Sequence, residues 1–100
     1  GAFTENYVLQ EMVAAGNKSI YYWSSEGKAE LNFVLQHQLN AYPLEVKSGL
    51  NRHKKSLRVY QEKFNPKQLS RTTAMNLKQE EDLINYPLYL ISRFPMMCTN

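Results

Sequence analysis

The sequence predicts an α+β domain in which helices pack against a mixed sheet. Apolar residues recur at helical spacing over 3–15 and again over 52–64. Between these segments, apolar and polar residues alternate as in half-buried strands, most clearly over 41–47. The predicted order is a helix, a three-strand antiparallel meander, a second helix, a fourth strand and a short closing element.

The first helix, residues 3–15, has an apolar stripe, a candidate N-cap at Thr4 and a natural end at Gly16. Four side chains form the stripe: Val8, Leu9, Met12 and Val13. Glu5 is spaced from them so that it falls on the buried side of the helix. As a carboxylate in the first turn it also complements the helix dipole.

The meander begins with a hairpin, in which strands 20–23 and 30–35 flank the turn "SSEGK". The turn "HQLN" then leads into the strand 41–47. Alternation assigns one face of the second strand to Leu31, Phe33 and Leu35, and the other to Glu30, Asn32 and Val34. The aromatic side chains of the first strand are expected to pack on the sheet rather than stack on bases: Tyr21, Tyr22 and Trp23.

The second helix, 52–64, presents an apolar-leaning face made of His53, Leu57, Tyr60 and Phe64. It crosses over to a strand at "KQLSRTT", residues 67–73, which is therefore expected to run parallel to 41–47. The acidic stretch "QEED" is predicted to be a solvated turn. "PLYLISRF" closes the fold as a strand or a short helix, and periodicity leaves both open.

Composition places the chain among globular domains. One hundred residues suit a single domain, 1–100, and the net charge of +3 tilts only mildly toward polyanions such as DNA. The single cysteine, Cys98, excludes an internal disulfide framework. With no signal-peptide pattern and no apolar run that could span a bilayer, the sequence predicts a cytoplasmic chain without a membrane partner. A helix pattern that begins almost at residue 1 suggests a fragment of a longer protein.

Glu45 and Lys47 share one face of the strand 41–47, beside the strand that carries Asn32 and beneath the helix that carries Glu5. Carboxylate oxygens are ligands for Mg²⁺, and a nearby lysine can stabilise charge that develops on a phosphodiester. By spacing alone, "E-x-K" is more typical of a surface ion pair than of a catalytic site. Convergence of all four side chains in one pocket would mark a catalytic site, whereas Glu5 and Glu45 on opposite faces of the sheet would exclude it.

Four blocks of sequence occur in the order found in a known family: "ENYVLQEM", "IYYWSSEGKAELNFVL", "PLEVKSGLNRHKKSLRVYQEKFNP" and "INYPLYL". Over residues 1–90 the chain resembles the C-terminal domain of unknown function of prokaryotic AAA-type ATPases, which is similar to the PD-(D/E)xK, or restriction-endonuclease-like, fold. The resemblance implies an ATPase domain N-terminal to this chain as a partner. ATP would bind there, because the phosphate loop "GxxxxGK[ST]" does not occur in this sequence.

The resemblance also implies a set of site residues. The helix-borne glutamate of the family falls on Glu5, and its "E-V-K" strand falls on Glu45 and Lys47, so that Glu5, Glu45 and the residue at position 32 would hold Mg²⁺ or Mn²⁺. The family strand usually reads "E-[VL]-D-F-V", whereas this chain has "ELNFV" and therefore Asn32 at the metal-binding aspartate. The amide keeps one oxygen ligand but lacks the negative charge, which weakens a divalent-metal site.

Three functions follow. The favoured one is a nuclease-like domain that has lost catalysis and binds nucleic acid or a protein partner. The alternative is an active Mg²⁺-dependent DNA endonuclease, with Glu5, Asn32, Glu45 and Lys47 as its catalytic set. The third is an oligomerisation domain, which an exposed apolar patch at "PLYLISRF" would indicate; the sequence itself leaves the oligomeric state open. Three basic side chains of the second helix usually indicate a solvated face, with contacts to the phosphates of a nucleic acid as the alternative: Lys54, Lys55 and Arg58.

Overall fold

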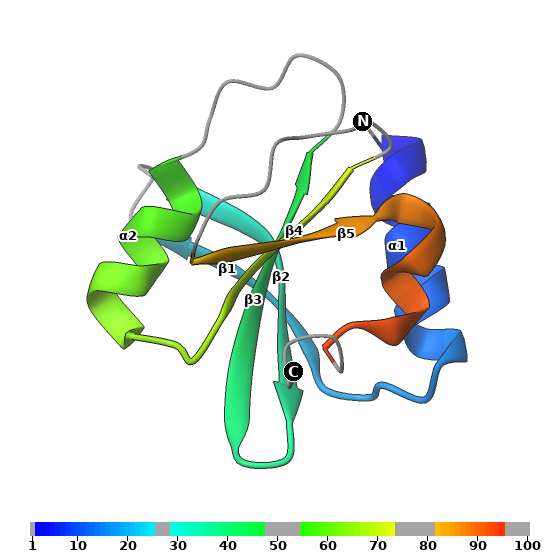
Figure 1. Cartoon of the computed structure of the whole chain (residues 1–100), viewed down its shortest axis with the longest axis horizontal. Helices are drawn as coiled ribbons and strands as arrows, with labels where there is room; N and C mark the ends of the chain where they lie inside the picture. Colours follow the sequence, from blue (N-terminus) through cyan, green and yellow to red (C-terminus); the bar gives the residue numbers. More distant parts are fainter. Residues whose placement is uncertain (1, 26–28, 48–54, 74–81, 96–100) are drawn as a thin grey trace.

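A five-stranded mixed sheet forms the centre of the fold, with its strands in the order β1-β2-β3-β4-β5 (Figure 1). The computed structural model describes residues 2–25, 29–47, 55–73 and 82–95. Its elements are α1 (Ala2–Ala14), β1 (Ile20–Ser25), β2 (Ala29–His37), β3 (Asn40–Lys47), α2 (Lys55–Phe64), β4 (Leu69–Thr73), β5 (Leu83–Pro87) and the 3-10 helix η1 (Leu88–Arg93). Strands β1 to β3 form an antiparallel meander, and β4 and β5 continue the sheet in parallel with β3. The predicted α+β class, the meander and the parallel fourth strand are confirmed.

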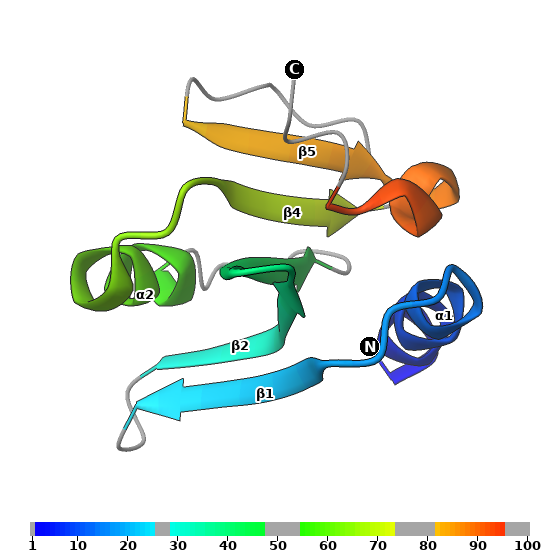
Figure 2. The ribbon, with the colours of Figure 1, turned by 90° about the horizontal axis from the view of Figure 1, so that it is seen from below.

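The helices cover the two faces of the sheet separately (Figures 1 and 2). One core cluster lies on the side of α1 and η1 and contains Val8, Met12, Leu35, Tyr42, Leu44, Val46, Tyr86, Ile91 and Phe94. The other lies on the side of α2 and contains Leu31, Val34, Leu57, Tyr60, Leu69 and Leu83. Because β3 is the middle strand, its alternating side chains are buried on both faces.

Helix α1 ends at a glycine, as the sequence predicts. Gly16 adopts a φ of +99°, its N–H donates to the carbonyl of Val13 at 2.9 Å, and the N–H of Asn17 donates to that of Met12 at 3.1 Å. These are the paired hydrogen bonds of a Schellman motif, in which the left-handed residue is usually glycine.

The predicted apolar stripe of α1 is only half buried. Val8 and Met12 are fully buried, but Leu9 is 39% and Val13 is 56% exposed. Glu5 is also exposed rather than buried, so its predicted position was wrong. The physical reason is that α1 packs mainly against η1 and β3, a contact that buries Val8 and Met12 but not Leu9 and Val13.

The closing segment contains an additional strand that the sequence analysis missed. Residues 83–87 pair in parallel with β4 as β5, and "PLYLISRF" splits at Pro87 into the end of this strand and η1. Ile91 and Phe94 are buried in the α1-side core, whereas Tyr89 is 77% exposed. This segment therefore contributes two buried apolar side chains to the core and leaves one tyrosine exposed.

Helix α2 forms the described part of the predicted second helix; residues 52–54, including His53, lie outside the described residues. Trp23 packs edge-on against Tyr60, with ring centroids 5.2 Å apart, and against Phe64 at 6.0 Å. The predicted packing of Trp23 on the sheet is thus confirmed. Tyr21 and Tyr22 are 56% and 61% exposed, so each is more exposed than buried.

Candidate functional site

A β-bulge in β2 determines the face of the sheet on which the side chain of Asn32 lies. Tyr21 pairs with Val34 and Trp23 pairs with Leu31, so two steps along β1 match three along β2. The extra residue breaks the alternation that the sequence predicts, because Leu31 and Val34 both pack on the α2 side. The bulge leaves Asn32 turned toward α1.

The Asn32 side chain joins three elements through both ends of its amide. Its Nδ2 donates to Oε1 of Glu5 at 3.0 Å, and its Oδ1 accepts from the backbone N–H of Val46 at 2.9 Å. The described backbone pairing of β2 with β3 stops at Phe33 and Leu44. Beyond it, the side chain of Asn32 replaces a backbone carbonyl as the hydrogen-bond acceptor for β3. An aspartate could accept from Val46, but in its ionised form it has no donor for Glu5. The amide is therefore the better fit to this position.

Glu45 lies on the opposite face of the sheet from Glu5. Its neighbours Leu44 and Val46 belong to the α1-side cluster, so alternation turns Glu45 toward α2. There it accepts from Nε of Arg71, its cross-strand partner on β4, at 2.8 Å. The side chains of Glu45 and Arg71 are only 6% and 5% exposed, so this is a buried ion pair.

Lys47 ends β3 on the same face as Glu45, opposite Thr73 of β4 in the parallel register. Its side chain is half-buried. Of the four predicted catalytic residues, the structure thus brings Glu5 together with Asn32 and places Glu45 and Lys47 on the other side of the sheet. The four side chains do not converge in one pocket.

This arrangement does not fit a magnesium ion held by the predicted ligands. Mg²⁺ requires oxygen atoms that converge at close range. Here Oε1 of Glu45 is bonded to a guanidinium, and Oδ1 of Asn32 accepts a backbone N–H. Within the described ranges, no group of three or more histidine, cysteine, aspartate or glutamate side chains is close enough to share a metal.

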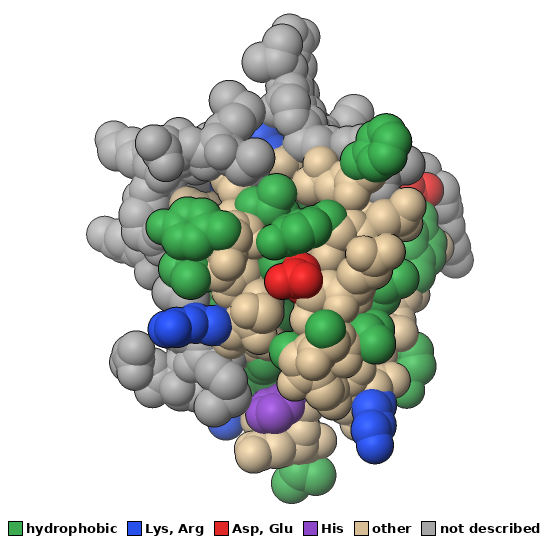
Figure 3. Space-filling view, turned by 90° about the vertical axis from the view of Figure 1, so that its right-hand side faces the viewer, with side chains coloured by type: hydrophobic (Ala, Val, Ile, Leu, Met, Phe, Trp, Pro, Cys, Tyr) green, Lys and Arg blue, Asp and Glu red, His purple; other side chains and the backbone are tan. Residues whose placement is uncertain are grey.

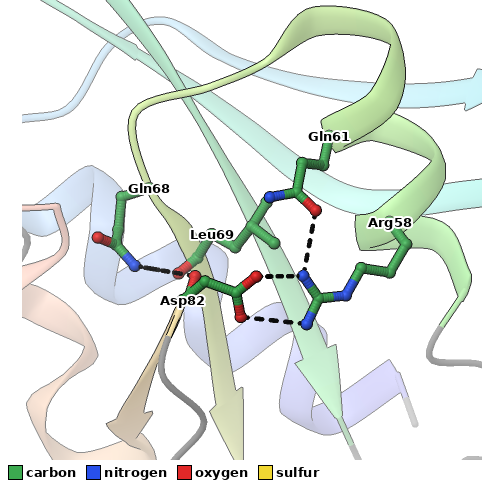
Figure 4. Close-up of polar contacts among 5 residues, drawn as sticks. All are labelled: Arg58, Gln61, Gln68, Leu69 and Asp82. Carbon is green, nitrogen blue, oxygen red and sulfur yellow. Dashed lines mark hydrogen bonds and ion pairs between the residues drawn. The ribbon is translucent and has the colours of Figure 1, made fainter.

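The one described member of the predicted phosphate-binding set is engaged within the protein (Figure 4). The two terminal nitrogens of Arg58 donate to the carboxylate of Asp82 at 2.5 and 3.1 Å, and one of them also donates to Gln61 at 3.1 Å. The hydrogen bond from Arg58 lowers the pKa of Asp82 below its ordinary 3.8. Lys54 and the side chain of Lys55 lie outside the described part of the chain.

The predicted solvated turn "QEED" is described only at its last residue. Residues 79–81 fall outside the described ranges, and Asp82 is exposed but anchors α2 to the start of β5. The amide of Gln68 adds a hydrogen bond to the backbone carbonyl of Asp82 at 3.3 Å. Arg58 and Asp82 therefore serve to hold two elements together.

A pocket that the sequence analysis did not identify lies between α1 and the edge strand β1. It has a volume of about 360 Å³, and we call it the α1–β1 pocket; its lining residues are Glu5, Asn6, Leu9, Ile20, Tyr21, Tyr22, Asn32 and Phe33. Figure 3 shows the α1 side of the molecule, where exposed hydrophobic side chains are scattered among few charged groups. The sequence feature that could have indicated this pocket is the pair of adjacent tyrosines, Tyr21 and Tyr22, in a strand at the edge of the sheet.

The acidic groups of the α1–β1 pocket interact with one of these tyrosines. Glu30, which is exposed on β2, lies near the hydroxyl of Tyr22. Desolvation raises the pKa of Tyr22 above its ordinary 10.0, and the nearby carboxylate of Glu30, together with the charge of Glu5, raises it further. Two carboxylates thus border an aromatic surface.

The described residues form a small α+β domain. The two predicted metal-binding carboxylates, Glu5 and Glu45, lie on opposite faces of its sheet, and an open pocket lies beside an edge strand. By its sequence the chain belongs to the family described as a domain of unknown function, DUF4143, which residues 1–91 match. Neither a curated protein nor a solved structure matches the chain. Among the described helices, none is both long and apolar enough to cross a lipid bilayer.

Proposed function

We propose that this chain is a PD-(D/E)xK-like domain that no longer hydrolyses phosphodiesters and serves as a protein-binding module for an AAA-type ATPase. The observation that carries the proposal is the separation of Glu5 and Glu45 by the sheet, with Glu45 bonded to Arg71. Metal-assisted hydrolysis needs its carboxylates around one ion. The separation of the Glu5 and Glu45 carboxylates supports a role in protein binding rather than in hydrolysis.

Two features favour a protein over a nucleic acid as the partner. Arg58 is paired with Asp82, which reduces the positive charge available for phosphates. Among the described residues, those that line the α1–β1 pocket include Glu5 but no lysine or arginine, and this lining would repel a phosphate backbone. The exposed tyrosines beside it suit a protein surface, since aromatic residues are enriched in protein interfaces.

Cleavage of supercoiled plasmid tests the loss of catalysis. The native chain and Lys47→Ala are incubated with plasmid and Mg²⁺ or Mn²⁺, and we expect both to leave the plasmid supercoiled. Nicking by the native chain that is abolished in Lys47→Ala would overturn the proposal and establish the alternative, a metal-dependent endonuclease.

Fluorescence anisotropy with a labelled DNA duplex tests the choice of partner. We expect no saturable binding at physiological ionic strength, either by the native chain or by the triple variant Lys54→Gln/Lys55→Gln/Arg58→Gln. A charge-matched control is Lys18→Gln/Lys63→Gln/Lys67→Gln, because these three side chains are all exposed. Saturable binding that only the first triple variant weakens would make the chain a nucleic-acid-binding module instead.

A further inference from the structure

The α1–β1 pocket combines three features of a peptide-binding site. The first is its position at a sheet edge, because β1 is the terminal strand of the described sheet. The carbonyl of Ser19 accepts from the N–H of Gln36 on β2. Since backbone groups alternate in direction along an antiparallel strand, those of Ile20 and Tyr22 point away from β2. Outward backbone groups on an edge strand can pair with an added strand.

The second feature is an apolar and aromatic lining. Leu9 is 39% exposed, Tyr21 is 56% exposed and Tyr22 is 61% exposed. They surround a hollow of about 360 Å³, which is enough for one long side chain but small for a folded element. Tyrosine rings can pack against the aliphatic stem of such a side chain and also attract a cationic head group.

The third feature is negative charge for which the described part of the chain shows no cationic partner. Glu5 lines the pocket, and Glu30 on β2 lies near Tyr22, another of the lining residues. Glu5 accepts a hydrogen bond from the side chain of Asn32, which is a neutral amide and not a cation. An organic cation can satisfy an exposed carboxylate without the multiple converging ligands that Mg²⁺ requires.

We infer that the α1–β1 pocket receives an arginine or lysine side chain from an extended segment of a partner protein, which adds to the sheet along β1. Main-chain hydrogen bonds to the edge strand hold the segment, and Glu5 with Tyr22 selects the cationic side chain. This assignment deepens the proposed function and rests on it, because it identifies the chemistry of the protein partner.

The test uses an extended probe peptide, acetyl-Thr-Val-Thr-Arg-Thr-Val-Thr-amide, and the same peptide with citrulline in place of arginine. Citrulline keeps the shape of arginine but has no charge. Binding to the isotope-labelled chain is followed by amide chemical shifts, which also locate the peptide. We expect shifts in β1 and α1, and an affinity for the arginine peptide at least about fivefold higher than for the citrulline peptide.

Matched variants separate the pocket from general charge effects. Glu5→Gln keeps an oxygen for the hydrogen bond from Asn32 and should weaken the arginine peptide about threefold or more. Tyr22→Ala should weaken it similarly. The controls are Glu62→Gln and Tyr89→Ala, which remove an exposed carboxylate and an exposed ring outside the pocket, and both should bind as the native chain does.

The outcomes distinguish this inference from the proposed function. Equal binding of both peptides, no binding, or unchanged affinity in Glu5→Gln would overturn the assignment of the pocket, while an intact plasmid would still support the proposed function. Plasmid nicking or saturable DNA binding would instead overturn the proposed function. Shifts confined to α2, or self-association of the chain through β1, would also contradict the inferred site.

Discussion

Removal of Arg71 should destabilise the fold severely, because Glu45 would then be buried without its ionic partner. The two side chains are 5% and 6% exposed, and their nearest nitrogen and oxygen are 2.8 Å apart. At that separation and an effective dielectric constant of about 20, their attraction is about 6 kcal/mol, which roughly offsets the cost of desolvating both ions. The net value of the pair is therefore small, but losing one partner costs about 3–5 kcal/mol.

Three variants measure this effect by urea unfolding, followed by circular dichroism at neutral pH. Arg71→Met should lose about 3–5 kcal/mol in the free energy of unfolding, a large part of the total for a domain of this size. Glu45→Leu/Arg71→Met removes both charges and should lie within about 2 kcal/mol of the native chain or exceed it. Arg93→Met is the control, because Arg93 is exposed, and should change stability by no more than about 0.5 kcal/mol.

A decrease of less than about 1 kcal/mol in the free energy of unfolding of Arg71→Met would refute the reasoning, because a buried carboxylate without an ionic partner destabilises a fold by more than that. A double variant as unstable as the single one would refute it as well, since the damage would then come from packing and not from the charge.

Three further predictions concern the amide, the surface ion pair and the helix end. Asn32→Asp should lower the free energy of unfolding, measured with urea, by about 1–3 kcal/mol, because it removes the hydrogen-bond donor to Glu5. The double variant Glu5→Gln/Asn32→Asp should recover most of this loss, because the glutamine supplies a donor again. Additive losses of the two substitutions would contradict this. Because Arg58 lowers the folded-state pKa of Asp82 below 3.8, the pair stabilises the fold above that pH and the benefit is lost as pH falls through the folded pKa. The melting-temperature difference between the native chain and Asp82→Asn should therefore shrink on acidification, and a constant difference would disprove the pairing. Gly16→Ala should lower the free energy of unfolding by about 1 kcal/mol, since φ at this position is +99° and no atom lies within 4 Å of an added Cβ; a neutral change would mean that the turn is not strained.

Local patterns predicted much of the fold. The helical spacing of Val8 and Met12 identifies α1, and the alternation of Tyr42, Leu44 and Val46 identifies β3, because each pattern arises within one element. The strand β5 was missed because "LINYP" is short, ends in proline and has apolar residues on both faces, as a strand beside a parallel neighbour does. Such a segment carries no clear period.

The candidate site was less predictable, because it depends on pairing between distant segments. The bulge in β2 arises from its register with β1, and it places Leu31 on the same face as Val34, whereas strict alternation assigns the two to opposite faces. The ion pair of Glu45 requires the register of β3 with β4, since Arg71 lies on another strand. Only the proximity of Glu5 to Asn32 followed from the expected packing of a helix on the hairpin.

The most direct test of the account is calorimetric titration of Mn²⁺ into the native chain and into Asn32→Asp. The account predicts no site-specific binding to either protein, because restoring the aspartate leaves Glu45 on the far side of the sheet, bonded to Arg71. One bound Mn²⁺ in either protein, lost in both Glu5→Gln and Glu45→Gln, would contradict it, since those two carboxylates would then have to share one ion.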